Sequence, residues 1–497
     1  MGENTSFTIA PPAGAIAGRG SVDVFLMDSV APPLAGVRDY MLAYPYGCLE
    51  QRTSKAIALG DVAAWNLIAS ELPAYLDGDG LARYFAADTL SGSESLTAYL
   101  LSITGEAGLP LPEGPKAKMI EAMKAVLDGR LRHEDYGDVR IQRVAAFAAL
   151  ARQGVATAAM VGQVGIGMND MPSALLADYL SALGRVQGLA NGPQLRAEGE
   201  RILRTRLVYE GTRIDLVDKA ASPWWLMSST DEAAIKLALA TLGRPAWQND
   251  TPRLMTGIAA RQVRGHWDTT TANAWGAVTA RKFMALYPAA SIAGITTGSL
   301  GAQSTSWTWP LLEPQRSFRF ALPAVTMPLM VRQSGGPGPW ALVSIKAAVP
   351  LTQPLNAGYK LTRSVEVVQA FKPGTLSRGD VVKVTITVEA SAERNWVVIN
   401  DPVPAGATVI GGLGGQSEML NAGAGSSGAA SPSYIERGRD SWRAYYGWVP
   451  RGSFTVSYVM RLNSAGTFNL PATRVEAMYS PEIRAAVPNQ QVVVAQR

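Results

Sequence analysis

A long run of helical segments between two β-rich parts is the feature that most constrains the fold of this chain. Residues 34 to about 287 are rich in Ala and Leu, and short breakers such as 108–112 and 191–193 divide them. About ten helices joined by such short loops pack most simply as antiparallel pairs. No strict sequence period relates them, which favours a closed ring of helical hairpins over an open solenoid. The expected helical segments are 49–71, 92–107, 114–129, 139–153, 172–186, 194–207, 231–242, 251–262 and 270–286.

Strand-like sequence occurs on both sides of this helical region. Residues 6–10 and 21–27 show partial alternation, and the β texture resumes near residue 290. Two strands alone cannot bury a core. We therefore expect them to pair with strands beyond residue 290, which makes the helical region an insertion in one β domain. Towards the C-terminus, short strands broken by Gly and Pro predict an antiparallel sandwich.

Length, charge and hydropathy exclude several classes of protein. A chain of 497 residues is too long for one ordinary core, so about two to four domains are expected. The net charge of +5 is spread over both signs without a run of Lys and Arg, which argues against nucleic-acid binding. No apolar stretch is long enough to span a membrane. Residues 1–5 have no signal-peptide features, and we expect natural sequence to precede them.

The single cysteine, Cys48, stands three residues before Gln51 in the run Tyr-Pro-Tyr-Gly-Cys-Leu-Glu-Gln at 44–51. A thiol and a carboxamide at positions i and i+3 can meet across one turn of backbone. Attack of the thiol on the amide carbon, with loss of ammonia, would give an internal thioester, which is a stored acylating agent. Pro45 and Gly47 suit a tight turn before a helix that begins near residue 49. The dipole of that helix is expected to favour the reactive thiolate.

The same residues also allow a less reactive interpretation. Cys48 can be a buried, inert thiol and Glu50 a solvated carboxylate at a helix start. Tyr44 and Tyr46 can shield a thioester from water, but tyrosines at such positions are also ordinary packing residues. A match over four residues does not decide between these interpretations by itself.

Metal and cofactor chemistry is not expected from this sequence. The two histidines, His133 and His266, lie far apart in the chain and have no other soft ligands beside them, which argues against a structural zinc site. We expect His133 to be a solvated loop residue and His266 to be a packing residue. No motif indicates a cofactor.

Several separated motifs, taken in order, resemble the bacterial α2-macroglobulins. The run 45–51, at the start of the helical region, looks like the thioester motif of that family. The run 266–275 (His-Trp-Asp-Thr-Thr-Thr-Ala-Asn-Ala-Trp) is similar to its late helical signature. The runs 401–406 and 476–484 are similar to its C-terminal macroglobulin-like domain. The resemblance covers nearly the whole chain.

The resemblance implies an α+β multidomain fold. Residues 1–30 and 288–358 would form a CUB-like β domain. Residues 31–287 would be the thioester domain, an α/α toroid inserted in that β domain. Residues 359–497 would form a C-terminal macroglobulin-like β-sandwich.

The resemblance also implies a protease inhibitor rather than an enzyme. The internal thioester would join Cys48 and Gln51, and Gly47, Leu49 and Glu50 would complete the motif. A lysine amine of an attacking protease would open the thioester and remain attached through a stable amide. Each molecule would therefore act once, as a covalent trap.

Further family features concern the surroundings of the thioester. By resemblance, Tyr44 and Met478 would cover it from the two sides of an interface with the last domain, and Tyr46 lies beside it in sequence. Neither His133 nor His266 matches the helical-domain histidine with which some complement-type relatives favour hydroxyl targets. Amines are therefore the expected targets. The bait region that proteases cut lies upstream in the family, so the chain looks like a C-terminal fragment.

The remaining expectations concern location, partners and other functions. The resemblance implies a periplasmic location, an inner-membrane lipid anchor in upstream sequence, and a partnership with a peptidoglycan-synthesising penicillin-binding protein. One alternative is an α/α-toroid enzyme, a glycoside hydrolase or a cyclase, with Glu134–Asp135 or Asp231–Glu232 as an acid/base pair. Another alternative is an inert β-rich scaffold protein. Uptake of methylamine at Gln51 distinguishes the inhibitor from both.

Overall fold

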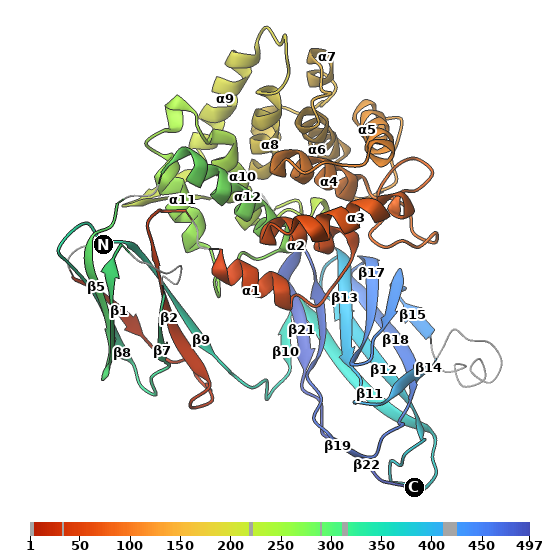
Figure 1. Ribbon diagram of the computed structural model, residues 1–497. Coiled ribbons are helices and arrows are strands. Elements are labelled where there is room, and N and C mark those ends of the chain that lie inside the picture. Colours follow the sequence, from red (N-terminus) through yellow and green to blue (C-terminus); the bar gives the residue numbers. More distant parts are fainter. Residues whose placement is uncertain (1–3, 32–33, 218–221, 289–290, 311–316, 411–424) are drawn as a thin grey trace. The chain divides into compact units, whose positions relative to one another are not determined.

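The computed structural model describes residues 4–31, 34–217, 222–288, 291–310, 317–410 and 425–497. The chain is a mixed α/β protein with two compact units, Met1–Pro350 and Leu351–Arg497. Figure 1 shows that the labelled helices lie in the first unit and that the second is built from strands. Within the described residues, no helix combines the length and apolar character needed to cross a bilayer.

The helices agree with the expected segments except that 49–71 is divided and that α1 and α7 lie in no expected segment. The segment 49–71 is two helices, because Gly60 adopts the left-handed conformation (φ +68°) that ends a helix at little cost for glycine. The side chain of Asp61 then caps the next helix by accepting a hydrogen bond from the N–H of Ala64. The helices are α1 (Ala35–Ala43), α2 (Leu49–Leu59), α3 (Val62–Tyr75), α4 (Glu94–Ala107), α5 (Glu113–Asp128), α6 (Val139–Arg152), α7 (Ala158–Val161), α8 (Ser173–Leu183), α9 (Gly192–Arg204), α10 (Thr230–Thr241), α11 (Thr251–Ala260) and α12 (Thr270–Leu286).

Six of these helices pack in a closed succession. Helix α2 packs against α12, α12 against α10, α10 against α8, α8 against α6, α6 against α4, and α4 against α2. Ten of the eleven residues of α8 and twelve of the fourteen residues of α4 are buried. Helices that are buried almost all round form an inner layer, and this layer carries the site described below.

A network of buried ions joins four of the inner helices. Arg152 on α6 lies 2.9 Å from Glu106 on α4 and 2.6 Å from Asp178 on α8. Lys236 on α10 lies 2.8 Å from Asp178 and 2.6 Å from Glu232. Burial alone would raise the pKa of Glu106, but Arg152 and the other neighbouring cations lower it to about 2. Glu106 is therefore ionised and paired in the interior.

The flanking strands pair across the helical insertion, as predicted. Strand β1 (Asn4–Ile9) pairs with β8, and β2 (Gly20–Met27) lies between β7 and β9. Apolar residues of these strands form one core. The other strands of the first unit are β3 (Leu207–Glu210), β4 (Arg213–Leu216), β5 (Gly294–Leu300), β6 (Gln303–Trp309), β7 (Ser317–Ala321), β8 (Met327–Ser334) and β9 (Trp340–Ala347). The sequence did not predict the hairpin β3–β4.

The second unit consists of antiparallel sheets that share one core. The two larger sheets have the orders β10-β21-β20-β13-β17-β16 and β11-β12-β18-β14, with β15 also paired to β18, and β19 pairs with β22. Its strands are β10 (Leu355–Ala357), β11 (Tyr359–Gln369), β12 (Val381–Ala390), β13 (Arg394–Pro402), β14 (Thr408–Ile410), β15 (Gly425–Gly428), β16 (Tyr434–Arg437), β17 (Ser441–Val449), β18 (Gly452–Arg461), β19 (Gly466–Phe468), β20 (Thr473–Ala477), β21 (Ser480–Val487) and β22 (Val492–Val494). Strand β10 pairs with β21 in this unit, although the predicted boundary between domains lies at 358/359.

Replacing the buried Arg152 tests how much the ion network contributes to the stability of the first unit. Arg152→Met should lower the free energy of unfolding of the first unit by about 3 kcal/mol, because two buried carboxylates lose a partner. Arg130→Met is the matched control, since Arg130 is exposed and pairs with Asp128 at the surface, and its loss should change the free energy of unfolding little. Denaturant unfolding followed by circular dichroism measures both. Equal losses would contradict the assignment.

Candidate functional site

The candidate site lies at the start of α2. Cys48 is the N-cap residue of this helix, with φ −67° and ψ 170°. Cys48 is 0% exposed and Gln51 is 2% exposed. Leu49 is also buried, and its N–H donates to the carbonyl of Tyr84 at 2.8 Å. Gly47 is exposed, with nothing within 4 Å of the place where a Cβ would stand. The turn thus carries the thiol and the carboxamide into the interior together.

Cys48 and Gln51 cap each other across the first turn. The N–H of Cys48 donates to Oε1 of Gln51 at 3.0 Å, and the N–H of Gln51 donates to the sulfur of Cys48. This is the reciprocal geometry of a capping box, with Cys in the place usually held by Ser or Thr and Gln at the third helical position. The structure therefore brings together the two groups that the sequence predicted would meet.

The thiol is protonated in this closed site. Burial raises the pKa of Cys48 well above its usual value, and the charge of Glu50 raises it further. Backbone N–H groups of the first turn act in the opposite direction, but burial outweighs them. The helix end thus favours the thiolate, as predicted, but the expected net gain of thiolate is wrong for the folded chain. A sulfur that is costly to ionise is also a poor leaving group.

Glu50 is an internal carboxylate. It is 0% exposed, and it accepts a hydrogen bond from the hydroxyl of Ser54 at 2.5 Å. The hydroxyl of Thr270 donates to both of its oxygens, at 2.8 and 3.1 Å. Since Thr270 is the first residue of α12, the carboxylate joins the N-terminal turns of α2 and α12, whose dipoles favour a negative charge. The solvated Glu50 of the inert interpretation is therefore wrong.

A row of aromatic rings precedes the buried turn. The ring of Tyr46, which is buried, meets Tyr44 edge-on with centroids 5.4 Å apart. Tyr44 meets Tyr40 at the same distance, and Tyr40 stacks on His266 at 3.8 Å. The prediction of His266 as a packing residue is confirmed. The shielding roles of Tyr44 and Tyr46 remain predictions.

Met478 lies in the second unit, in the turn between β20 and β21. Its N–H donates to the carbonyl of Trp396 at 3.0 Å, and its side chain is buried. Met478 is predicted to shield a thioester that belongs to the first unit, and this role also remains a prediction.

Residues from distant segments enclose the site, and the sequence did not single them out. The hydroxyl of Tyr84 lies 3.1 Å from the sulfur of Met227, whose carbonyl accepts from the hydroxyl of Thr271 at 2.9 Å. Tyr99 contacts the hydroxyl of Ser54 at 2.5 Å. Burial chiefly raises the pKa of both tyrosines, and Cys48 is among the smaller causes. Only the Thr-rich run 269–271 stood within a recognised motif.

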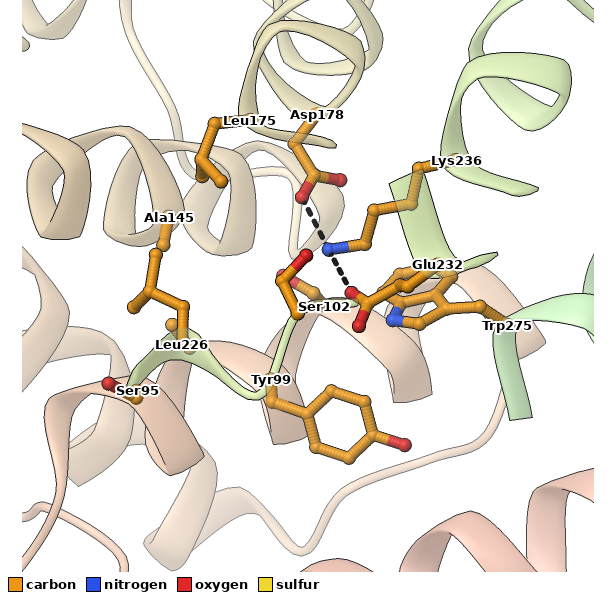
Figure 2. Close-up of a pocket in the computed structure, with 12 residues that line it drawn as sticks. Ser95, Tyr99, Ser102, Ala145, Leu175, Asp178, Leu226, Glu232, Lys236 and Trp275 are labelled. Carbon is orange, nitrogen blue, oxygen red and sulfur yellow. Dashed lines mark hydrogen bonds and ion pairs between the residues drawn. The ribbon is translucent and has the colours of Figure 1, made fainter. Parts of the chain in front are cut away.

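One cavity among the inner helices, lined by Tyr99, Asp178 and Trp275, is too small for a sugar or a terpene. It measures about 30 Å³, which is room for about one water molecule, whereas ligand pockets measure roughly 300–1,000 Å³. Figure 2 shows that its carboxylates, Asp178 and Glu232, both bind the ammonium of Lys236. This cavity gives no support to the toroid-enzyme alternative.

The acidic pairs considered for that enzyme have structural surroundings. Glu134 is buried and accepts hydrogen bonds from Ser93 and Ser95, each at 2.6 Å. Burial, and then the charge of Glu94, raise its pKa to about 7. Asp231 is also buried and pairs with Arg261 at 3.2 Å. These contacts hold segments together and do not form an acid/base couple around a substrate cavity.

His133 lies in a loop, as predicted, but it is half-buried and not solvated. Its Nε2 lies 3.0 Å from the carboxylate of Asp79, and its Nδ1 lies 3.2 Å from the carbonyl of Gly92 and 3.5 Å from Asp77. Burial lowers the pKa of the His133 ring, but these acceptors outweigh burial and raise it. The three side chains are close enough to hold a cation. Acceptors at both ring nitrogens nevertheless fit a charged histidine better than a metal ligand, which must be neutral.

Comparisons with known proteins show what the chain is similar to. The family model of the bacterial alpha-2-macroglobulin MG10 domain matches residues 358–482. A curated alpha-2-macroglobulin homolog from Nostoc sp. is 22% identical over 356 residues, which cover 64% of this chain and 18% of that protein. The match thus spans a small part of the relative's length.

Two solved structures share the fold of nearly the whole chain. Native alpha-2-macroglobulin from Escherichia coli, from domain MG7 to the C-terminus, has a TM-score of 0.74 at 19% identity, over 99% of this chain and 81% of that one. Salmonella alpha-2-macroglobulin reacted with methylamine has a TM-score of 0.73 at 20% identity, over 99% and 33%. The predicted resemblance to the C-terminal region of bacterial α2-macroglobulins is therefore confirmed.

The raised pKa of Glu134 predicts a pH-dependent difference in stability. The folded chain holds this proton up to about pH 7, whereas an unperturbed glutamate titrates near 4.5. The unfolded state therefore loses the proton first, and wild type loses stability relative to Glu134→Gln as the pH rises through this window. Unfolding free energies measured across the window test this. The exposed Glu121→Gln is the control, and a pH-independent difference for Glu134→Gln would contradict the prediction.

Proposed function

We propose that this chain is part of a bacterial α2-macroglobulin-like protease inhibitor and that Cys48 and Gln51 form an internal thioester. The observation that carries the proposal is their reciprocal capping within one fully buried helical turn. Such a turn supplies both reacting groups, fixes them beside each other and excludes water. The match of residues 358–482 to an MG10 domain supplies the family context.

Thioester formation follows from the geometry of the turn. The sulfur of Cys48 attacks the amide carbon of Gln51, and the C=O electron pair moves onto Oε1. That oxygen already accepts a hydrogen bond from the N–H of Cys48, which is placed to stabilise the developing charge. The C–N bond then breaks, and the nitrogen leaves as ammonia with the proton of the thiol.

Capture of a protease is the second step of the proposed reaction. A lysine amine attacks the acyl carbon of residue 51, a C–N bond forms, and the C–S bond breaks. The electron pair goes to sulfur, and the proton lost by the amine accompanies it. The products are a stable amide at position 51 and a free thiol at Cys48, so the molecule acts once. Salmonella alpha-2-macroglobulin has been characterised after reaction with methylamine, which is a small amine of the same class.

Burial explains how such a bond can be stored. The interior position of Cys48 keeps water away and makes the sulfur a poor leaving group. Tyr44, Tyr46 and Met478 are proposed to complete the cover, and separation of the cover would expose the bond. Conformational opening, rather than a catalytic group, would therefore switch on the reaction.

The wider assignments rest on the resemblance and are part of the same proposal. They are the CUB-like domain of residues 1–30 and 288–358, the α/α toroid of 31–287 and the macroglobulin sandwich of 359–497. The closed succession of inner helices supports the toroid. A bait region in upstream sequence, a periplasmic location, a lipid anchor and a penicillin-binding protein as partner complete the proposal for the whole protein.

Methylamine labelling tests the proposed reaction. The native chain should take up one methylamine at Gln51 and release one thiol at Cys48, as measured by peptide mass spectrometry and thiol titration. Cys48→Ala and Gln51→Ala should abolish uptake. Gln163→Ala, at an exposed glutamine, should leave it unchanged. Uptake that survives in Cys48→Ala would refute the proposal.

A further inference from the structure

Glu50 occupies an unusual position for a carboxylate. It lies between Cys48 and Gln51 in the same helical turn, and like Cys48 it is 0% exposed. Hydroxyl groups from α2 and α12 hold it in one orientation. A buried carboxylate in a site that makes and loses negative charge affects the reaction through space, whether or not it touches the reacting atoms.

We propose that Glu50 is a positioning residue whose fixed negative charge slows the loss of the thioester while the site is closed. The inference rests on the proposed thioester between Cys48 and Gln51. It assigns to Glu50 an electrostatic role in storage, in addition to its structural link between the two helices.

The hydrogen bonds of Glu50 favour its charged form. The hydroxyl of Thr270 donates to both carboxylate oxygens, and the hydroxyl of Ser54 donates to one of them. Hydrogen bonds donated to a carboxylate stabilise its charge. The N-terminal turns of α2 and α12 favour that charge.

The charge opposes both stages of attack on the thioester. When an amine or water adds to the acyl carbon of residue 51, negative charge develops on its oxygen. When the C–S bond then breaks, the electron pair goes to the sulfur of Cys48. A carboxylate in the same water-free turn raises the energy of both charges, because electrostatic repulsion is weakly screened there. The raised pKa of the Cys48 thiol, to which Glu50 contributes, shows the same repulsion in the unreacted chain.

Opening of the site removes this restraint. Once water reaches Glu50, its high dielectric constant screens the carboxylate from the acyl oxygen and the sulfur. The same movement that admits a lysine amine thus also removes the repulsion that protected the bond. The thioester is then stored while the repulsion from Glu50 is unscreened, and it reacts once water screens that repulsion.

The test compares aminolysis of the closed chain with and without the charge. Purified Glu50→Gln and wild type are treated with methylamine, and loss of the thioester is followed by intact mass. Glu50→Gln should react faster than wild type, because a thiol of lower pKa is a better leaving group. Glu113→Gln, in the exposed first turn of α5, is the matched control and should react at the wild-type rate. An equal or slower reaction of Glu50→Gln would overturn the inference.

Two further variants distinguish the effect of the lost charge on aminolysis from the effect of a loosened structure. Thr270→Val removes a hydroxyl that holds Glu50 but keeps the charge, so it should accelerate aminolysis less than Glu50→Gln does. Equal acceleration would mean that loosening is responsible and would overturn the inference. Glu50→Asp also keeps the charge and should stay slower than Glu50→Gln.

A second measurement does not depend on thioester formation. In a Gln51→Ala background Cys48 keeps its thiol, and the pH dependence of its alkylation gives its pKa. Adding Glu50→Gln should lower that pKa, and an unchanged value would overturn the inference. If wild type forms no thioester, the proposed function fails. If wild type and Glu50→Gln both form it and react alike, only the role of Glu50 fails.

Discussion

Burial of the first turn of α2 is the constraint on which the candidate site depends. Cys48, Glu50 and Gln51 are polar or ionisable, and a helix start normally leaves its N–H groups to water. Here the side chains of Cys48 and Gln51 satisfy those groups, and Thr270 and Ser54 satisfy the carboxylate. The turn can therefore lie in the interior, where its thiol is protonated and its acyl chemistry is protected.

The inner helices provide the rigid support for this turn. Helix α12 places Thr270 against Glu50 and, one residue later, places Thr271 within reach of Glu232. Glu232 belongs to the ion network of Lys236 and Asp178. A continuous set of polar contacts thus connects the candidate site to the centre of the helical region. In buried networks of this kind each member depends on its neighbours.

The sequence predicted what is local and missed what depends on packing. Cys48 and Gln51 meet because their spacing is one helical turn, and Gly60 ends α2 by its own backbone preference. The contact between Tyr84 and Met227 joins residues 143 positions apart. A short sequence motif cannot predict a contact over such a distance in the chain. The thiolate prediction failed for the same reason, since the helix end is visible in sequence and the depth of burial is not.

The first measurement to make is the intact mass of the natively purified chain, before any amine is added. The proposed thioester predicts a chain lighter than its sequence by one ammonia, with the deficit located in a cross-linked Cys48–Gln51 peptide. A chain of full sequence mass, with Gln51 still an amide and Cys48 a free thiol, would contradict it.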